Sequence, residues 1–219
     1  MSAPMNLEKV FVREIERNDT KVLQINQCEV GDVGCVVWDA AIVLAKYLES
    51  EDFHKGKDLM DKNVMEIGAG TGVVGLMAAS YGAKVSITDL DQFVPLMQLN
   101  IDTNKQLFQH PVQAKELVWG SEVKTEYPNV DILLLADCIY YEESLEPLVK
   151  TMDDLCGSDT CIYCCYEERT TDNKPALQRK FLHMVGKLFQ IEKIPLHRQD
   201  SQFCSEDIHI LKLKRLKVS

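Results

Sequence analysis

Residues 64–91 read VMEIGAGTGVVGLMAASYGAKVSITDLD, with two short apolar runs, a glycine-rich turn between them and an acidic residue in each run. Four glycines lie between positions 68 and 75, and glycine lets a backbone turn tightly and approach a ligand because it has no Cβ. The pattern predicts a strand, a tight turn, a helix and a second strand. In an open α/β sheet, ligands bind beyond the carboxyl ends of the strands, where this turn would lie. The stretch therefore predicts a site for a nucleotide-like molecule.

The same alternation of apolar runs and amphipathic segments continues along the chain. Strands are expected near residues 62–67, 84–89, 112–118, 130–136 and 159–166, with helices near 72–81, 93–105, 142–155 and 175–188. Near-continuous apolar strands such as DILLLA indicate a parallel sheet covered on both faces. The last runs, at 189–196 and 207–216, lack a long helical pattern between them and are expected to close the sheet as an antiparallel pair. The fold class is therefore doubly wound α/β.

The residues ahead of the sheet are interpreted as an extension. Runs at 10–15 and 21–26 flank a turn-like segment at 17–19, which predicts an antiparallel hairpin. Asp39 is expected to cap a helix over 40–50, because apolar residues recur there at helical spacing. At 219 residues, one domain is expected over 1–219, with the extension over 1–36 and a core over 37–219.

Charge and composition narrow the class of protein. The 34 acidic and 24 basic side chains give a net charge of -10, which disfavours nucleic acid as a partner. The apolar runs are too short to span a bilayer and the first residues lack a secretory signal, so the cytoplasm, or alternatively the nucleus, is the expected location. A monomer is expected, because a small single-domain enzyme can work as one. The eight cysteines are interpreted as reduced thiols. No metal is expected at Cys161 and Cys164, because residues three apart in a strand face opposite sides.

Two ligands compete for the glycine turn. Gly70, Gly72 and Gly75 fit the dinucleotide fingerprint, and Asp89 follows about 20 residues later, as a ribose-binding acid should. This pattern alone permits an NAD-dependent oxidoreductase. Glu66 favours a different cofactor, because an acidic surrounding suits a positive sulfonium better than a pyrophosphate. That cofactor is S-adenosylmethionine.

Several motifs then resemble one family. EIGAGTG at 66–72 resembles the first motif of seven-stranded, Rossmann-like S-adenosylmethionine-dependent methyltransferases, although Ala69 stands where many relatives have serine. The segments GCVVWDAAIVLAKYLE at 34–49, VWG at 118–120, LADCIYYEESLEPLVKTM at 135–152 and CCYEERT at 164–170 resemble small protein-lysine methyltransferases with an Asp-x-x-Tyr motif. The resemblance covers residues 10–214. It implies methyl transfer to a lysine of a protein partner, which we expect to be the AAA ATPase valosin-containing protein.

The resemblance also implies roles for individual residues. Trp38 and the turn Gly68-Ala69-Gly70 would line the methionine side of the cofactor, with Glu66 beside them. Asp89 would bind the ribose, and Trp119 and Ala136 would contact the adenosine. Asp137 and Tyr140 would form the catalytic pair. Glu167 and Arg169 would shape the lysine entrance or pair with each other.

Each role has a structural alternative. Trp38 could pack as a hydrophobic staple, Trp119 could pack at a rim, Asp137 could cap a helix, and Tyr140 could be a core aromatic. A methyltransferase-fold binding module without turnover is the competing class. Nucleic-acid amino methyltransferases on this fold typically carry Pro-Pro-aromatic where this chain has Asp137-Cys138-Ile139-Tyr140, and a carboxylate suits a flexible lysine better than a flat base.

The chemistry sets one requirement on the site. A lysine attacks only as the neutral amine, and its reference pKa is about 10.4. A carboxylate raises a lysine pKa, so Asp137 is expected to bind and orient the arriving ammonium more than to deprotonate it. Tyr140 is expected to hydrogen-bond the amine and steer its lone pair.

Overall fold

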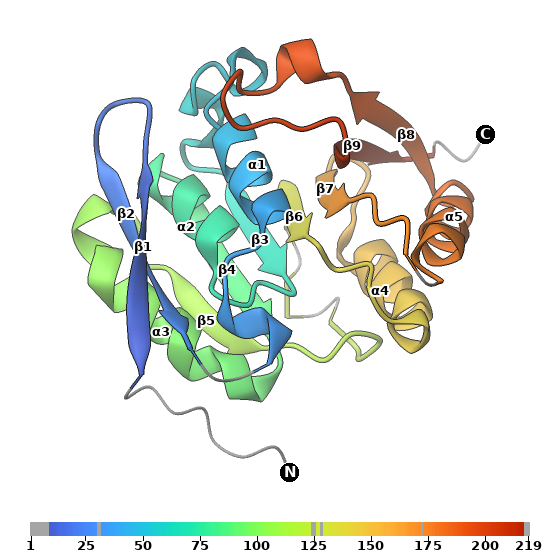
Figure 1. Ribbon diagram of the computed structural model, residues 1–219, viewed down its shortest axis with the longest axis horizontal. Helices are drawn as coiled ribbons and strands as arrows, with labels where there is room; N and C mark the ends of the chain where they lie inside the picture. Colours follow the sequence, from blue (N-terminus) through green and yellow to red (C-terminus); the bar gives the residue numbers. More distant parts are fainter. Residues whose placement is uncertain (1–8, 30–31, 124–125, 128, 172, 217–219) are drawn as a thin grey trace.

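The computed structural model describes residues 9–29, 32–123, 126–127, 129–171 and 173–216. Within these ranges the centre is a seven-stranded sheet of order β5-β4-β3-β6-β7-β9-β8 (Figure 1). The strands are β3 (Asn63–Ile67), β4 (Lys84–Asp89), β5 (Gln113–Glu116), β6 (Ile132–Ala136), β7 (Cys161–Glu167), β8 (Phe189–Ile194) and β9 (Ile208–Arg215). β5, β4, β3, β6 and β7 run parallel, whereas β9 pairs antiparallel with β7 and β8. The expected parallel strands and antiparallel end pair are confirmed, and the last strand, β9, lies beside β7.

Helices cover both faces of this sheet (Figure 1). On one face lie α1 (Asp39–Tyr47), α2 (Val73–Ser80) and α3 (Val94–Asn104), and on the other lie α4 (Glu142–Leu155) and α5 (Lys174–Val185). Successive strand residues face opposite sides, so Val64 packs with α1 to α3 whereas Met65 packs with α4 and α5. Both faces of the central strands are thereby buried, which confirms the doubly wound α/β class.

The start of α1 differs from the prediction. Asp39 is the first helical residue, and Trp38 occupies the cap position without a side-chain capping bond. The expected Asp39 cap is therefore wrong. The Asp39 carboxylate still lies in the first turn, where the helix dipole favours a negative charge.

The extension forms the expected hairpin, β1 (Val10–Glu16) paired antiparallel with β2 (Val22–Cys28). It is a separate two-stranded sheet that lies against α3 (Figure 1). Asn26 N–H donates to Asn100 Oδ1 at 2.6 Å, and Gln24 N–H donates to Asn104 Oδ1 at 2.9 Å. Two asparagine side chains of α3 thus accept hydrogen bonds from the backbone of β2, in the place where a third strand would otherwise accept them.

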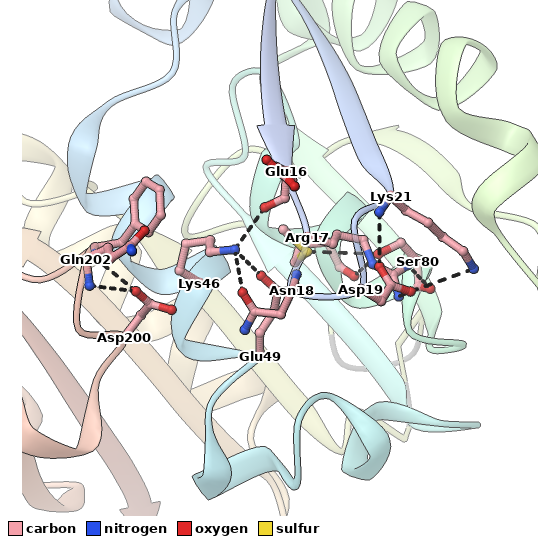
Figure 2. A network of polar contacts seen from close by, with 12 residues as sticks. Glu16, Arg17, Asn18, Asp19, Lys21, Lys46, Glu49, Ser80, Asp200 and Gln202 are labelled. Atoms are coloured by element: carbon pink, nitrogen blue, oxygen red, sulfur yellow. Dashed lines mark hydrogen bonds and ion pairs between the residues drawn. The ribbon is translucent and has the colours of Figure 1, made fainter.

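The hairpin turn is fixed by a second set of polar contacts (Figure 2). Lys46 and Glu49 form an ion pair of 2.5 Å whose side chains are 3% and 0% exposed. Lys46 Nζ also donates to Glu16 O at 2.8 Å, and Asn18 N–H donates to Glu49 at 2.8 Å. Arg17 donates to Ser80 O at 2.6 Å. We call Arg17, Asn18, Lys46 and Glu49 the turn network, and it joins the hairpin to α1 and α2.

Three further sequence expectations can be compared with the fold. In β7, Cys161 contacts the core on the side of α1 to α3, whereas Cys164 lies in the core on the side of α4 and α5, so the two thiols point to opposite faces. In the described residues, no group of three or more His, Cys, Asp or Glu side chains is arranged to hold a metal ion. None of the described helices combines the length and the apolar character needed to cross a membrane.

Candidate active site

A cavity of about 470 Å³ opens at the carboxyl ends of the parallel strands. The ten residues expected at the site all line it, namely Trp38, Glu66, Gly68, Ala69, Gly70, Asp89, Trp119, Ala136, Asp137 and Tyr140. They come from the ends of β3, β4 and β6, from the cap of α1 and from the segment after β5. Parallel strands place their carboxyl ends at one sheet edge, which explains why residues about 100 positions apart meet there.

The glycine turn after β3 forms the floor of the cavity. Gly68 and Gly70 have φ values of 62° and 53°, in the left-handed region that glycine adopts without strain. A Cβ at Gly68 would lie 2.7 Å from both Cys138 Sγ and Trp119, and one at Gly70 would lie 2.7 Å from Gly34 O. Both positions therefore require glycine for conformation and for space, and both line the cavity.

Asp89 ends β4 with its carboxylate held by two backbone groups. Gly70 N–H donates to Oδ2 and Leu90 N–H donates to Oδ1, each at 2.7 Å. Both oxygens keep a further lone pair, so together they can accept hydrogen bonds from two neighbouring hydroxyls of a ligand. This arrangement fits the ribose of an adenosine cofactor.

Glu66 lines the cavity but differs from the expectation in its charge. The side chain is buried, and its carboxyl accepts a hydrogen bond from Gly75 N–H at 2.7 Å. Burial raises the pKa of Glu66 to about 8, so the carboxyl is mostly protonated at neutral pH. The negative charge expected here is therefore largely suppressed, and the contact made by Glu66 is to the first turn of α2.

Two tryptophans form walls of the cavity. Trp38 is 41% exposed and its Nε1–H donates to Val33 O at 2.8 Å, so it lies at the surface and does not pack as a staple in the core. Trp119 packs partly buried against the cluster of α4 and α5 and lies against Gly68. One indole is thus held over the segment ahead of α1, and the other against the glycine turn.

Asp137 lies in the turn after β6. Its φ of 55° is left-handed, and its N–H donates to Cys165 O at 2.8 Å, which continues the pairing of β6 with β7. Burial raises the pKa of the Asp137 carboxyl above its usual value, although the neighbouring Arg169 guanidinium acts to lower it. Asp137 does not cap α4, because that helix begins five residues later with Tyr141 at the cap position.

The Asp137 carboxylate is paired with a cation from the segment after β7. Arg169 Nη2 lies 2.5 Å from Asp137 Oδ2 and 3.2 Å from Glu167 Oε2. The guanidinium also lies 5.4 Å from the ring centroid of Trp38. Glu167 and Arg169 therefore pair with each other, which is one of the two arrangements expected from the sequence. Arg169 also pairs with Asp137.

Tyr140 completes the turn with its ring near that of Tyr141, at a centroid distance of 4.6 Å. Burial raises the pKa of the Tyr140 phenol, which keeps it protonated at neutral pH. Its backbone oxygen accepts a hydrogen bond of 2.5 Å from Lys174 Nζ. The turn from Asp137 to Tyr140 is thus contacted at both ends by cations that follow β7.

Some cavity residues were not expected from the sequence. Asp32, Gly34, Leu90 and Lys174 also line it. Asp32 caps the short helix η1 (Val33–Cys35), and this helix lies over the glycine turn. The expected boundary between an extension over 1–36 and the core therefore passes through a wall of the cavity. Only the motif segment beginning at Gly34 pointed to this stretch, since it has no strand or helix periodicity of its own.

Comparisons with known proteins agree with this geometry. A family described as "Lysine methyltransferase" matches residues 17–187. The chain is 39% identical over 166 residues to the human "Putative methyltransferase-like protein 21E pseudogene", which covers 74% of this chain and 59% of that sequence. It is 36% identical over 189 residues to the zebrafish (Danio rerio) "Protein N-lysine methyltransferase METTL21A", which covers 84% of this chain and 79% of the relative. The match to the yeast (Saccharomyces cerevisiae) "Protein-lysine N-methyltransferase EFM6" is 31% identical and covers 84% and 83%. The chain spans only 55 to 65% of the length of the 21E relatives it matches.

Solved structures share the fold. The structure of T. thermophilus 16S rRNA N2 G1207 methyltransferase (RsmC), in complex with AdoMet and guanosine, superposes with a TM-score of 0.64 at 16% identity, over 99% of this chain and 53% of that one. A predicted O-methyltransferase from Agrobacterium tumefaciens superposes with a TM-score of 0.55 at 12% identity, over 82% of each chain. These likenesses show the seven-stranded, Rossmann-like methyltransferase fold.

Proposed function

Because the chain belongs to the lysine methyltransferase family, we propose that it transfers methyl groups from S-adenosylmethionine to a lysine side chain of a protein. One observation carries the proposal. The glycine turn, Asp89 and the Asp137–Tyr140 turn line a single cavity, so a cofactor and an amine can meet there. S-adenosylmethionine, the cofactor of this class of enzyme, supplies an electrophilic methyl group on a sulfonium when it is bound.

Residues of the cavity would hold the cofactor by complementary chemistry. Gly68, Ala69, Gly70 and the Trp38 ring, which line the cavity together, suit the methionine portion, and Glu66 would support this turn through its hydrogen bond to Gly75 in α2. The two oxygens of Asp89 suit the ribose hydroxyls. Trp119 and Ala136 provide apolar surface for the adenosine. None of these assignments needs a phosphate-binding group, which separates the proposal from a dinucleotide site.

The Asp137–Arg169 pair bears on how a lysine is made neutral. A free carboxylate would hold an ammonium strongly and raise its pKa, which opposes attack on the methyl group. Arg169 already neutralises much of the Asp137 charge, since the two groups lie 2.5 Å apart. We expect the substrate amine to lie beside this pair, hydrogen-bonded to Asp137 and close to the positive charge of Arg169. That environment orients the amine while it disfavours the ammonium form.

Tyr140 would complete the orientation of the amine. Its raised pKa keeps the phenol protonated, so it brings no negative charge that would hold an ammonium. The phenol oxygen can accept one N–H of the neutral amine, and the lone pair of the nitrogen is then left free to face the methyl group. Methyl transfer is an in-line displacement, so this alignment supplies much of the catalysis.

The partner is the finer part of the proposal. We propose the AAA ATPase valosin-containing protein as substrate, on the resemblance of the motifs between residues 10 and 214, and we propose a monomer of the cytoplasm or nucleus. The net charge of -10 supports a protein substrate over nucleic acid.

The test is transfer of labelled methyl groups from S-adenosylmethionine, first into a cell lysate and then into purified valosin-containing protein. Asp137→Asn, which keeps the size of the side chain, is the matched control. A labelled band of that ATPase, lost with the variant, is the expected result. Labelling of other proteins only would overturn the named substrate. Tight cofactor binding without any labelling would favour a binding module and overturn the enzyme.

A further inference from the structure

A lysine of the chain itself lies in the proposed active site. Lys174 is the first residue of α5, and among the lysines in the described ranges it is the one that lines the cavity. Its Nζ lies 2.5 Å from the backbone oxygen of Tyr140 and 5.9 Å from the ring centroid of Tyr141. An amine therefore lies beside the Asp137–Tyr140 turn, which we call the catalytic turn, before any other protein is present.

The contacts of Lys174 allow its side chain to leave the Tyr140 carbonyl. Its bond is to a neutral carbonyl, whereas Lys180, farther along the same helix, pairs with the Glu142 carboxylate at 3.1 Å. The Lys174 side chain is half-buried and flexible, and it lines the same cavity as Asp137, so rotation about its bonds can move Nζ within that cavity.

We propose that Lys174 is a methylation site modified by its own chain, an inference that rests on the proposed function. Nζ first gives a proton to water, and its lone pair then forms a bond to the methyl carbon of S-adenosylmethionine. The electrons of the broken carbon–sulfur bond pass to sulfur, which leaves neutral S-adenosylhomocysteine. Because the amine is tethered to the cavity wall, its effective concentration at the site exceeds that of a free lysine.

The modification changes the contact with the catalytic turn. A monomethylated or dimethylated ammonium keeps an N–H that can donate to Tyr140 O, whereas a trimethylated one has none. Full methylation would thus remove the hydrogen bond that joins α5 to the turn. Addition of one or two methyl groups would leave this hydrogen bond in place.

The experiment incubates the full-length enzyme with labelled S-adenosylmethionine, without other protein, and maps the label by peptide mass spectrometry. Lys174→Arg tests the site, and Lys180→Arg is the matched control on the same helix. We expect label on the Lys174 peptide of the wild type and of K180R, and its loss in K174R. The fraction modified per unit time should not change when the enzyme is diluted. Calorimetric binding of S-adenosylhomocysteine checks that both variants are folded.

A parallel reaction with cell lysate separates this inference from the proposed function. Labelled lysate proteins with an unlabelled Lys174 would overturn self-methylation and leave the lysine methyltransferase intact. No label on any protein would overturn both. Equal label in K174R, or a rate that falls with dilution, would overturn the assigned site or the reaction within one chain.

Discussion

The ion pair of Lys46 with Glu49 and that of Asp137 with Arg169 have the same 2.5 Å separation but different surroundings. In the turn network, the side chains are 3% and 0% exposed, and Glu49 also accepts bonds from Asn18 N–H and the Tyr81 hydroxyl. At the cavity, Asp137 and Arg169 are 8% and 26% exposed, and the guanidinium divides its bonds between two carboxylates.

The difference teaches what each pair is able to do. The charged atoms of Lys46 and Glu49 are engaged by residues of the hairpin, α1 and α2, so this pair fixes the hairpin. The Asp137–Arg169 pair borders open volume, so a second amine can approach the carboxylate. A buried pair whose charged atoms are all engaged holds its elements in one arrangement, whereas a partly open pair permits exchange of partners.

The largest expected effect comes from breaking the turn network. Lys46→Met leaves the Glu49 carboxylate buried without its cation, which should lower the free energy of unfolding by about 3–5 kcal/mol. Urea unfolding measures this change. Lys150→Met is the control, because the pair of Lys150 with Asp154 is exposed and contributes little. Equal stability of K46M and wild type would contradict the assigned role of the network.

Breaking the Asp137–Arg169 pair should lower the activity more than the stability of the fold. Asp137→Asn keeps the volume but removes the charge, and we expect methyl transfer to fall by about 100-fold, the scale for loss of one preorganised polar group. Steady-state kinetics on the labelled substrate measures it. Affinity for S-adenosylhomocysteine should stay near that of the wild type, and a parallel loss of affinity would point to misfolding.

Replacing the second cavity carboxylate, that of Asp89, should affect only the affinity for the cofactor. Asp89→Asn retains one acceptor oxygen and loses the charge, and hydrogen bonds to charged groups contribute about 1.5–3 kcal/mol. The dissociation constant for S-adenosylmethionine should therefore rise by about 10- to 100-fold in calorimetry. An unchanged constant would argue against the ribose contact.

Glu66 supplies a pH-dependent contrast to Asp89 and Asp137. Its pKa of about 8 in the folded chain exceeds the ordinary 4.5, so between these pH values the folded state holds a proton that the unfolded state has lost. Stability should therefore fall as pH rises through this window, by at most about 1.4 kcal/mol per pH unit from this group. Glu66→Gln should show a flatter profile in thermal unfolding. A steeper profile in the variant would refute the buried protonated carboxyl.

The smallest expected effect sharpens the role of Arg169. Arg169→Gln leaves the full charge of Asp137 facing the amine, so the bound lysine should become harder to deprotonate and its KM should fall. The rising limb of kcat against pH, which reports the pKa of the bound lysine, should move to higher pH by about one unit. Arg169→Lys keeps the charge and should keep the limb in place. A limb that does not move in R169Q would exclude this electrostatic role.

Local signals explain why much of the site could be predicted. The glycine turn, Asp89 and the Asp137–Tyr140 motif each follow a buried strand, and the geometry of parallel sheets brings strand ends together. Trp38 and Trp119 depended on resemblance, since no periodicity marks them as cavity residues. The helix start at Asp39 was missed by one position because Trp38 takes the cap conformation without a side-chain bond.

Other features depend on contacts between distant segments, which a linear pattern does not record. The charge of Glu66 is suppressed by burial under α2, and burial depends on the whole fold. The approach of η1 to the glycine turn joins positions 34 and 70. The pairing of Arg169 with Asp137 required the turn after β6 and the segment after β7 to be placed side by side.

The interior position of β9 has a consequence for how the protein is made. This strand pairs along its length with β7 on one side and β8 on the other. Until Arg215 has emerged from the ribosome, β7 presents an unpaired edge and β8 has no neighbour in the sheet. An unpaired edge of this kind is a template for association between chains. The nascent protein therefore depends on β9 to cover the edge beside the proposed catalytic segment, and the sheet cannot be completed until this strand has left the ribosome.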